Sequence, residues 1–262
     1  GDMHTDITRA FRNYHLFGFT GTPIFAENAS SSGKANLRTT QQAFGDQLHS
    51  YTIVDAIRDN TVLPFRVDYL NSFRVRDGVD NHDVEGIDTD SAYMNPQRIS
   101  AVVSYILEHF DQKTMRHASF QYKKRRVNGF NSLFATSSIK AARAYYQEFK
   151  RQQADLPEAR RLSVGIIYSY APNAEAPGTG LLSEESMDPS ALSQDDRAFL
   201  DEAIADYNQQ FGTNYGTDAS GFESYYESLS QALTDRRIDL VIVVDMFLTG
   251  FDSKSLNTLW VD

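Results

Sequence analysis

Residues 130–150 read FNSLFATSSIKAARAYYQEFK, and this segment gives the clearest indication of the fold. A short, mostly apolar run ends at Ala135, hydroxyl residues follow it, and a helical pattern extends from Ile139 to about Gln152. A parallel strand needs a crossover connection, which is usually a helix, and it is buried on both faces. The segment therefore predicts one βα unit of a parallel sheet.

Three more buried strands are expected in the same half of the chain, each with a continuous rather than alternating apolar run. They are LSVGIIYSY (162–170), IDLVIVVDMF (238–247) and LNTLWVD (256–262). Helices are expected from Pro96, where apolar residues recur at helical spacing, and near 194–210 and 221–235. Strands that alternate with helices in this way predict an α/β domain with a parallel sheet.

The N-terminal third is less regular. Residues 1–14 have helical spacing, LFGFT (16–20) reads as a short apolar strand, and a short helix is expected near 53–58. A further strand is expected over 62–69, and the polar residues 74–93 are expected to form a loop. The chain begins with a helix and a strand that have no sheet neighbour nearby in the sequence, and it ends directly after a strand, without a closing helix. We therefore expect it to be part of a longer protein.

Charge is strongly segregated along this chain of 262 residues and net charge −10. Residues 113–161 hold 12 Lys and Arg against 3 Asp and Glu, whereas residues 172–235 hold 1 Arg against 13 acidic residues. These segments are either two solvated surfaces or a phosphate-facing surface beside an acidic one.

The chain has no cysteine, which excludes disulfides and thiol chemistry. No apolar run approaches the length of about 20 residues that spans a membrane.

Small hydroxyl residues and glycine follow three of the expected strands. These clusters are Thr20–Pro23, Thr136–Ser138 and Thr249–Asp252. Each cluster alone is typical of a turn or a helix N-cap. Together they suggest one ligand-binding edge, because ligands of open parallel sheets bind beyond the carboxyl ends of the strands, where amides and hydroxyls hold phosphate. The six histidines are dispersed, so no metal site is expected.

Four segments in this order resemble the restriction (R) subunit of type I restriction–modification enzymes, which are superfamily 2 helicase-like DNA translocases. They are HLFGFTGTPIF (15–25), AFGDQLHSYTIVDAIRDNTVLPFRVDY (43–69), FNSLFATSSIKAARAYYQEFK (130–150) and VVDMFLTGFDSKSLNTLWVD (243–262). The resemblance implies a motor of two RecA-like lobes with ATP between them and duplex DNA across both.

By this resemblance the chain is an incomplete second RecA-like lobe that carries the tail of the first. Residues 1–23 would be that tail, ending in helicase motif III, and residues 24–94 the linker and the start of the second lobe. Residues 95–262 would form the second lobe, with an acidic helical insertion at 172–235.

The resemblance also implies roles for individual residues. Coupling of nucleotide state to DNA contact would fall on Thr20, Gly21, Thr22 and Pro23. DNA-backbone contact would fall on Thr136, Ser137, Ser138 and Thr249, and approach to the nucleotide on Gly250 and Asp252, next to Phe251. The basic stretch from Lys123 to Arg126 lies outside the family motifs. A solvated loop is the favoured interpretation of this stretch, and a further DNA contact through Lys123 and Lys124 is the alternative.

The implied cofactors are ATP and Mg²⁺, although the phosphate-binding lysine, the acidic motif II and the arginine-bearing motif VI are absent from this sequence. No catalytic or metal-binding residue is therefore expected here, and the chain alone should be inactive. The implied partners are double-stranded DNA and the methyltransferase and specificity subunits, in the cytoplasm of a bacterium or archaeon and away from membranes. Another superfamily 2 DNA translocase, in repair or remodelling, and a non-catalytic docking module are the alternatives.

Overall fold

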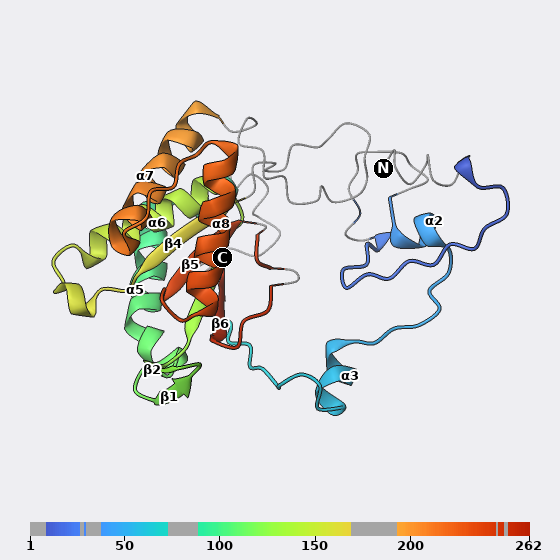
Figure 1. The fold of residues 1–262 in the computed structure, drawn as a ribbon, viewed down its shortest axis with the longest axis horizontal. Coiled ribbons are helices and arrows are strands. Elements are labelled where there is room, and N and C mark those ends of the chain that lie inside the picture. The colour runs from blue at the N-terminus through green and yellow to red at the C-terminus, as the bar shows by residue number, and fades with distance from the viewer. Residues whose placement is uncertain are drawn as a thin grey trace, which may run out of the picture. The chain divides into compact units, whose positions relative to one another are not determined.

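The computed structural model describes residues 9–26, 29, 38–72, 89–168, 193–244, 246–248 and 251–262 (Figure 1). The chain divides into two compact units. The first is built mainly from residues 1–70, and the second from residues 71–172 and 185–262. Within the described ranges, no helix is both long enough and apolar enough to cross a membrane.

The second unit is an α/β domain around a four-stranded parallel sheet. Its strands are β3 (Asn131–Ala135), β4 (Val164–Tyr168), β5 (Leu240–Val244) and β6 (Leu256–Val261). They lie in the order β4-β5-β3-β6, and every neighbouring pair is parallel. The sequence predictions of the parallel sheet and of its four strands are confirmed. This sheet agrees with the RecA-like lobe that the resemblance implies.

Four long helices surround the sheet, and all four were expected from the sequence. They are α5 (Pro96–Lys113), α6 (Ile139–Gln153), α7 (Gln194–Phe211) and α8 (Ala219–Thr234). Each begins after a residue whose side chain accepts a hydrogen bond from a first-turn amide, as N-caps do. These N-caps are Asn95, Ser138, Ser193 and Asp218. Short helices α4 (Thr89–Tyr93) and η2 (Glu158–Arg160) complete the unit.

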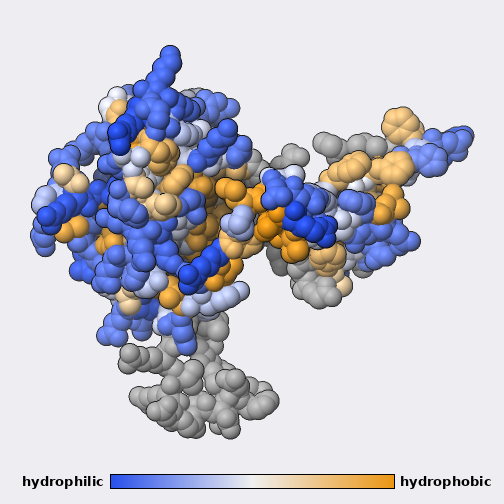
Figure 2. All heavy atoms as spheres, turned by 90° about the horizontal axis from the view of Figure 1, so that it is seen from below, coloured by the Kyte–Doolittle hydropathy of each residue, from blue (hydrophilic) through white to orange (hydrophobic). Residues whose placement is uncertain are grey.

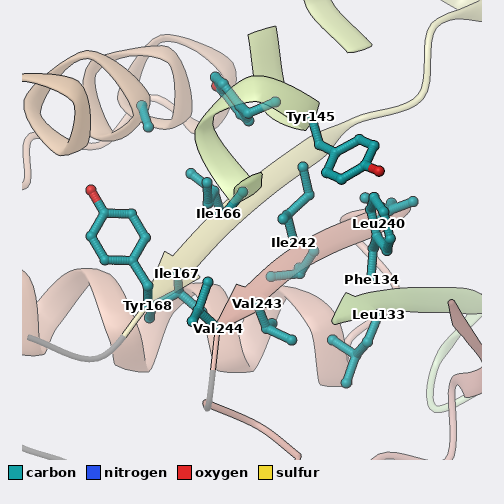
Figure 3. Packing of buried hydrophobic residues seen from close by; sticks show 14 of the residues in the cluster. Leu133, Phe134, Tyr145, Ile166, Ile167, Tyr168, Leu240, Ile242, Val243 and Val244 are labelled. Carbon is teal, nitrogen blue, oxygen red and sulfur yellow. The ribbon is translucent and has the colours of Figure 1, made fainter. Parts of the chain in front are cut away.

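Helices cover the central strands on both sides. Figure 3 shows Phe134, Ile166 and Ile242 on the side of the sheet where Tyr145 of α6 lies. Ile167, Val243 and Leu133 lie on the other side, as the two-residue period of a strand requires. All these residues are at most 3% exposed, so β3, β4 and β5 form the centre of one hydrophobic core.

Close approach of α8 to the second face depends on a glycine. A Cβ at Gly165 of β4 would lie 2.9 Å from Leu229 Cδ1 of α8 and 2.8 Å from Ile238 Cδ1. The Tyr225 hydroxyl of the same helix donates a hydrogen bond to the Ile166 carbonyl at 2.7 Å. The absence of a side chain at position 165 therefore lets α8 pack directly on β4.

The edge strand β6 is covered on one face. Trp260, the chain's one tryptophan, packs edge-on against Tyr105 of α5, with ring centroids 6.4 Å apart. Leu259 and Val261 point to the opposite face and are 55% and 74% exposed. The expectation of a sheet covered on both faces is thus confirmed for β3, β4 and β5 but is wrong for β6.

The basic stretch 123–126 is not a loop. Strands β1 (Ser119–Tyr122) and β2 (Arg125–Asn128) pair in an antiparallel hairpin with Lys123 and Lys124 at its turn. The loop prediction gave weight to the charges and missed Phe120 and Tyr122, which lie two apart in β1, and Val127 of β2, which pairs with Phe120 on the same face of the ribbon. Two aromatic rings, of Phe120 and Phe130, stack at 4.8 Å and hold that face against the unit.

The first unit contains the short helices α2 (Thr40–Phe44) and α3 (Ile53–Arg58). The helix near 53–58 is confirmed, and Thr52 caps it in a box with Asp55. The strands expected at 16–20 and 62–69 are wrong, because neither stretch is paired with a neighbouring strand among the described residues. A strand is stable only when its backbone groups are paired.

Apolar side chains of these two stretches are exposed, and Figure 2 shows hydrophobic residues at the surface of this unit. Phe19 is 97% exposed, Leu63 85% and Tyr69 93%. Of the helix expected at 1–14, residues 1–8 lie outside the described ranges, and only residues 9 and 10 of the remainder are helical. The polar loop expected at 74–93 is wrong at its end, where α4 forms, and its residues 74–88 are outside the described ranges.

Candidate functional site

The hydroxyl cluster after β3 lies at the carboxyl edge of the sheet, and its three members have different environments. Thr136 is buried, and its hydroxyl donates to the Val243 carbonyl of β5 at 3.3 Å. Ser138 caps α6 by accepting from the Ala141 amide at 3.2 Å. Ser137 stands between them and is exposed. Of the three hydroxyls, that of Ser137 is therefore best placed to meet a ligand.

The first turn of α6 adds positive character beside Ser137. The leading amides of a helix have no partner within it and carry the positive end of the helix dipole. Lys140, on this first turn, is exposed. A hydroxyl, helix amides and an ammonium group gathered at one sheet edge suit an anionic ligand such as a phosphate.

Asp262 reaches the same edge from β6, where its amide donates to the Ala135 carbonyl at 3.0 Å. Its carboxylate is held by Arg98 of α5 and by Tyr145 of α6. Arg98 Nη1 lies 2.9 Å from Asp262 Oδ2, Arg98 Nη2 donates to Oδ1, and the Tyr145 hydroxyl donates to Oδ2 at 2.6 Å. The guanidinium also donates from Nε to Ser72 Oγ at 3.0 Å.

Electrostatics keep the two donors of this cluster, Arg98 and Tyr145, protonated. Burial lowers the pKa of Arg98, but the hydrogen bond and charge of Asp262 outweigh burial and raise that pKa above its usual value. Burial and the bond to Asp262 raise the pKa of the Tyr145 hydroxyl well above its usual value. Tyr145 therefore stays protonated and donates, and Arg98 neutralises a carboxylate that would otherwise repel an anion at this edge.

The segment after β5 reaches the same edge in part. Met246 and Phe247 are buried, and the Phe247 ring stacks on Tyr226 of α8 at 5.2 Å and contacts Phe251 at 4.6 Å. Asp252 is exposed. Thr249 and Gly250, the candidates for DNA and nucleotide contact, lie outside the described residues. The described part of this segment therefore offers Asp252 as its one exposed carboxylate.

The cluster Thr20–Pro23 belongs to the first unit. The Thr22 amide donates to Thr20 Oγ1 at 3.1 Å, which forms a local turn. Thr20, Gly21 and Thr22 are exposed, and Pro23 is half-buried. The following residue, Ile24, is tied to α2 because its amide donates to Thr40 Oγ1 at 2.8 Å and its carbonyl accepts from the Thr40 amide at 3.0 Å.

Lys123 and Lys124 do not join this edge. Lys123 pairs with Asp235, which follows α8 and precedes β5, so the hairpin turn lies at the amino edge of the sheet. Ser137 follows β3 at the opposite edge. The structure thus places the two sets of residues that the sequence prediction considered for DNA contact at opposite edges of the sheet.

Sequence reasoning missed Arg98, Tyr145 and Asp262 as a unit. Tyr145 is a buried core residue, but its hydroxyl also has a specific acceptor in Asp262. The sequence signal that could have revealed this cluster is Arg98, which precedes the apolar stripe of α5 and lies on the buried side of that helix. A buried guanidinium requires an acceptor, and the carboxylate after β6 supplies it.

Among the described residues, no three His, Asp or Glu side chains gather as metal ligands. Asp252 is the one candidate nucleotide contact that is described, and a single exposed carboxylate cannot hold a triphosphate. No catalytic step is therefore derived through ATP or Mg²⁺.

A parallel sheet with a hydroxyl cluster and a capped helix at its carboxyl edge is an open α/β architecture, and RecA-like helicase lobes belong to this class. The comparisons agree with this class and specify the family. Residues 128–262, just over half of the chain, match the family described as type I restriction enzyme subunit R domain 3, and residues 1–97 match the SWI2/SNF2 ATPase family. The chain belongs to the R-subunit family of type I restriction enzymes.

Curated relatives carry the same description. The whole chain is 39% identical to the type I restriction enzyme SauMRSORF196P endonuclease subunit of Staphylococcus aureus strain MRSA252 and covers 26% of it. It is 40% identical to the SsaAORF53P endonuclease subunit of Staphylococcus saprophyticus, again over the whole chain and 26% of the relative. The chain thus spans about a quarter of the length of these relatives. A putative MpnIIP endonuclease subunit middle part of Mycoplasma pneumoniae is 37% identical over 39% of this chain and 82% of that protein.

Proposed function

We propose that this chain is part of an ATP-dependent motor that translocates double-stranded DNA within a type I restriction endonuclease. Its family membership and its RecA-like sheet support the proposal. The carboxyl edge carries it most directly, because Ser137, the start of α6 and Lys140 present uncharged and positive donors where Asp262 has been neutralised.

In this proposal the chain contributes contacts rather than the chemistry. DNA phosphates would be contacted by Ser137, Ser138 and Thr249, of which Thr249 lies outside the described residues. The nucleotide would be approached by Gly250 and Asp252. Thr20–Pro23 would couple nucleotide state to DNA contact. Thr136 would support Ser137 from beneath, since its own hydroxyl is engaged with Val243.

The remaining parts of the proposal concern the intact enzyme. ATP and Mg²⁺ would be held mainly by residues outside this chain. The partners would be duplex DNA and the methyltransferase and specificity subunits, and the location would be the bacterial or archaeal cytoplasm. The names of the relatives, which are restriction endonuclease subunits of bacteria, support this reading.

The test uses the full-length subunit assembled with its methyltransferase and specificity partners. DNA-stimulated ATP hydrolysis and displacement of a triplex-forming strand are measured for the wild type and for Ser137→Asp. A carboxylate at position 137 should repel phosphate and lower both activities by about tenfold or more. Ser137→Asn, which adds bulk without charge, is the matched control and should retain most of the activity.

An intact wild-type assembly that shows no DNA-stimulated ATP hydrolysis would contradict the proposal. ATP hydrolysis without dependence on methyltransferase and specificity subunits would favour another superfamily 2 translocase. Absence of nucleotide binding by the full-length subunit would favour a docking module.

A further inference from the structure

The turn of the β1–β2 hairpin has an unusual sequence for its geometry. Two-residue hairpin turns strongly favour Asn-Gly or Asp-Gly, because their residues adopt positive φ. Here the turn is Lys123-Lys124, and Lys123 has φ +52°. A residue with a long side chain in this conformation is locally unfavourable, and such outliers are commonly found where a site requires them.

Lys123 has a structural role in this hairpin. Its ammonium group pairs with Asp235, next to the C-terminus of α8, where the helix dipole favours a cation. The neighbouring Tyr122 hydroxyl donates to the Thr234 carbonyl at 2.9 Å. These two contacts fasten the tip of the hairpin to the end of α8.

The base of the hairpin is also fixed. Arg236 donates to the Gly129 carbonyl at 3.0 Å and to the Asn128 carbonyl at 3.1 Å, and its Nη1 lies 2.8 Å from Asp239 Oδ1. Arg116, after α5, lies 2.6 Å from the same carboxylate oxygen. A hairpin held at both ends is a rigid arm and presents its side chains without further ordering.

Three cations of this arm remain available. Lys124, Arg125 and Arg126 are exposed, and no carboxylate of the described residues lies within ion-pair distance of them. Arg126 donates from Nε to Ser119 Oγ at 2.8 Å, which orients its guanidinium along the hairpin. Phe120 and Val127 face the unit, and Arg125, opposite Tyr122, lies on their face of the ribbon but is exposed. The outward face carries Arg126 among uncharged polar residues, with Lys124 at the turn, and it has no apolar side chain.

We propose that Lys124, Arg125 and Arg126 form a second DNA contact, which binds the phosphate backbone of duplex DNA at the sheet edge opposite Ser137. A cationic surface without an apolar anchor suits phosphates better than a protein partner, since the centres of protein interfaces are depleted of charged residues. The inference rests on the proposed function, and it adds an attachment point outside the helicase motifs. Lys123 serves to hold the arm and not to contact DNA.

The experiment uses the full-length subunit and a short fluorescein-labelled DNA duplex. Affinity is measured by fluorescence anisotropy over a range of salt concentrations for the wild type and for Lys124→Gln/Arg125→Gln. The control double variant Lys150→Gln/Arg151→Gln removes the same charge, but its two cations are already paired with carboxylates of the chain. Circular dichroism checks that both variants remain folded.

Loss of two phosphate contacts should weaken binding by about tenfold at moderate salt and make the slope of log K against log salt less steep by about 2. The control variant should bind like the wild type. Charge reversal, Lys124→Glu/Arg125→Glu, should weaken binding further.

The inference would be overturned if both hairpin variants bound DNA with wild-type affinity and salt slope, and the proposed function would remain intact. If such variants also failed to assemble with a partner subunit, the arm would bind an acidic protein surface instead of DNA. A wild-type subunit that binds no duplex at low salt would overturn the proposed function together with this inference.

Discussion

Arg98 on the first turn of α5 and Asp262 at the end of β6 form an ion pair across 164 positions of sequence, with side chains 7% and 14% exposed. Each partner supplies two atoms to the contact, so the guanidinium meets the carboxylate in the bidentate geometry that makes such pairs strong. The pair fastens the edge strand to the helix that covers it.

Replacement of Arg98 by Met should destabilise the chain. It leaves Asp262 nearly buried with Tyr145 as its remaining side-chain donor in the described structure, and breaking one side of a buried pair costs about 3 kcal/mol. Urea unfolding followed by circular dichroism measures this loss. The double change Arg98→Met/Asp262→Asn removes both charges and should recover part of the stability. A single variant as stable as the wild type would show that the pair contributes nothing.

Glu148 should confer stability that depends on pH. The hydrogen bond from Arg151, opposed by burial and helped by Gln152, lowers the pKa of Glu148 from 4.5 to about 2. A carboxyl group with a lowered folded-state pKa stabilises the fold above its unfolded pKa, and this contribution disappears as pH falls from about 4.5 to about 2.

Comparison of the wild type with Glu148→Gln tests this dependence. The wild type should be more stable by about 1 kcal/mol at pH 6, a value reduced for solvent screening because Arg151 is 65% exposed. The difference should vanish near pH 2. A difference that stays constant over this range would contradict the assignment to ionised Glu148.

Gly129 should tolerate no side chain. It has φ +58°, and a Cβ there would lie 2.6 Å from the Thr114 carbonyl oxygen and from the Arg116 Cα, both backbone atoms. Gly129→Ala should therefore lose about 2 kcal/mol or more in unfolding free energy. Gly212→Ala is the matched control. It also has positive φ, at +67°, but no atom lies within 4 Å of its added Cβ, so about 1 kcal/mol is expected.

Substitutions of the three neighbouring hydroxyl residues after β3 should separate effects on stability from effects on activity. Thr136→Val removes a buried hydroxyl that is bonded to the Val243 carbonyl and should lower stability by about 1 kcal/mol. Ser138→Ala removes the N-cap of α6 with a similar loss. Ser137→Ala should leave stability unchanged and lower the DNA-stimulated ATPase activity of the full-length assembly. Equal unfolding midpoints for all three variants would contradict this division.

The purified chain alone should hydrolyse no ATP, with or without duplex DNA. Its sequence lacks the phosphate-binding lysine and the acidic magnesium motif, and phosphoryl transfer depends on such groups. A phosphate-release assay against an inert protein of similar size measures this. Hydrolysis stimulated by DNA would show that catalytic groups lie within these residues.

The second unit followed closely from its sequence because its central strands β4 and β5 are apolar runs and its long helices begin at capping residues. Leu240–Val244 and the stripe of α5 have patterns that no other element matches. The hairpin was missed because its four charges in a row, at residues 123–126, obscured a period of two. Phe17, Phe19 and Leu63 led to strand predictions that failed, because an apolar run forms a strand only where another strand pairs with it.

The site was only partly predictable. Hydroxyls after β3 could be placed at the carboxyl edge from strand order alone, but the burial of Thr136 and exposure of Ser137 depend on how β5 pairs with β3. The partnership of Arg98, Tyr145 and Asp262 joins three distant parts of the chain, and no local pattern encodes it. Lys123 pairs with Asp235 whereas Lys124 does not, and this difference depends on the positive φ of Lys123 at the turn.

Trp260 stands two residues before Asp262 on the partly covered face of β6 and contacts Tyr105. As the chain's one indole, it makes this strand optically distinguishable from every other element. Its emission should respond when a ligand at the adjacent edge shifts β6 against α5. The fold thus contains an intrinsic fluorophore that reports on the candidate edge without any added label.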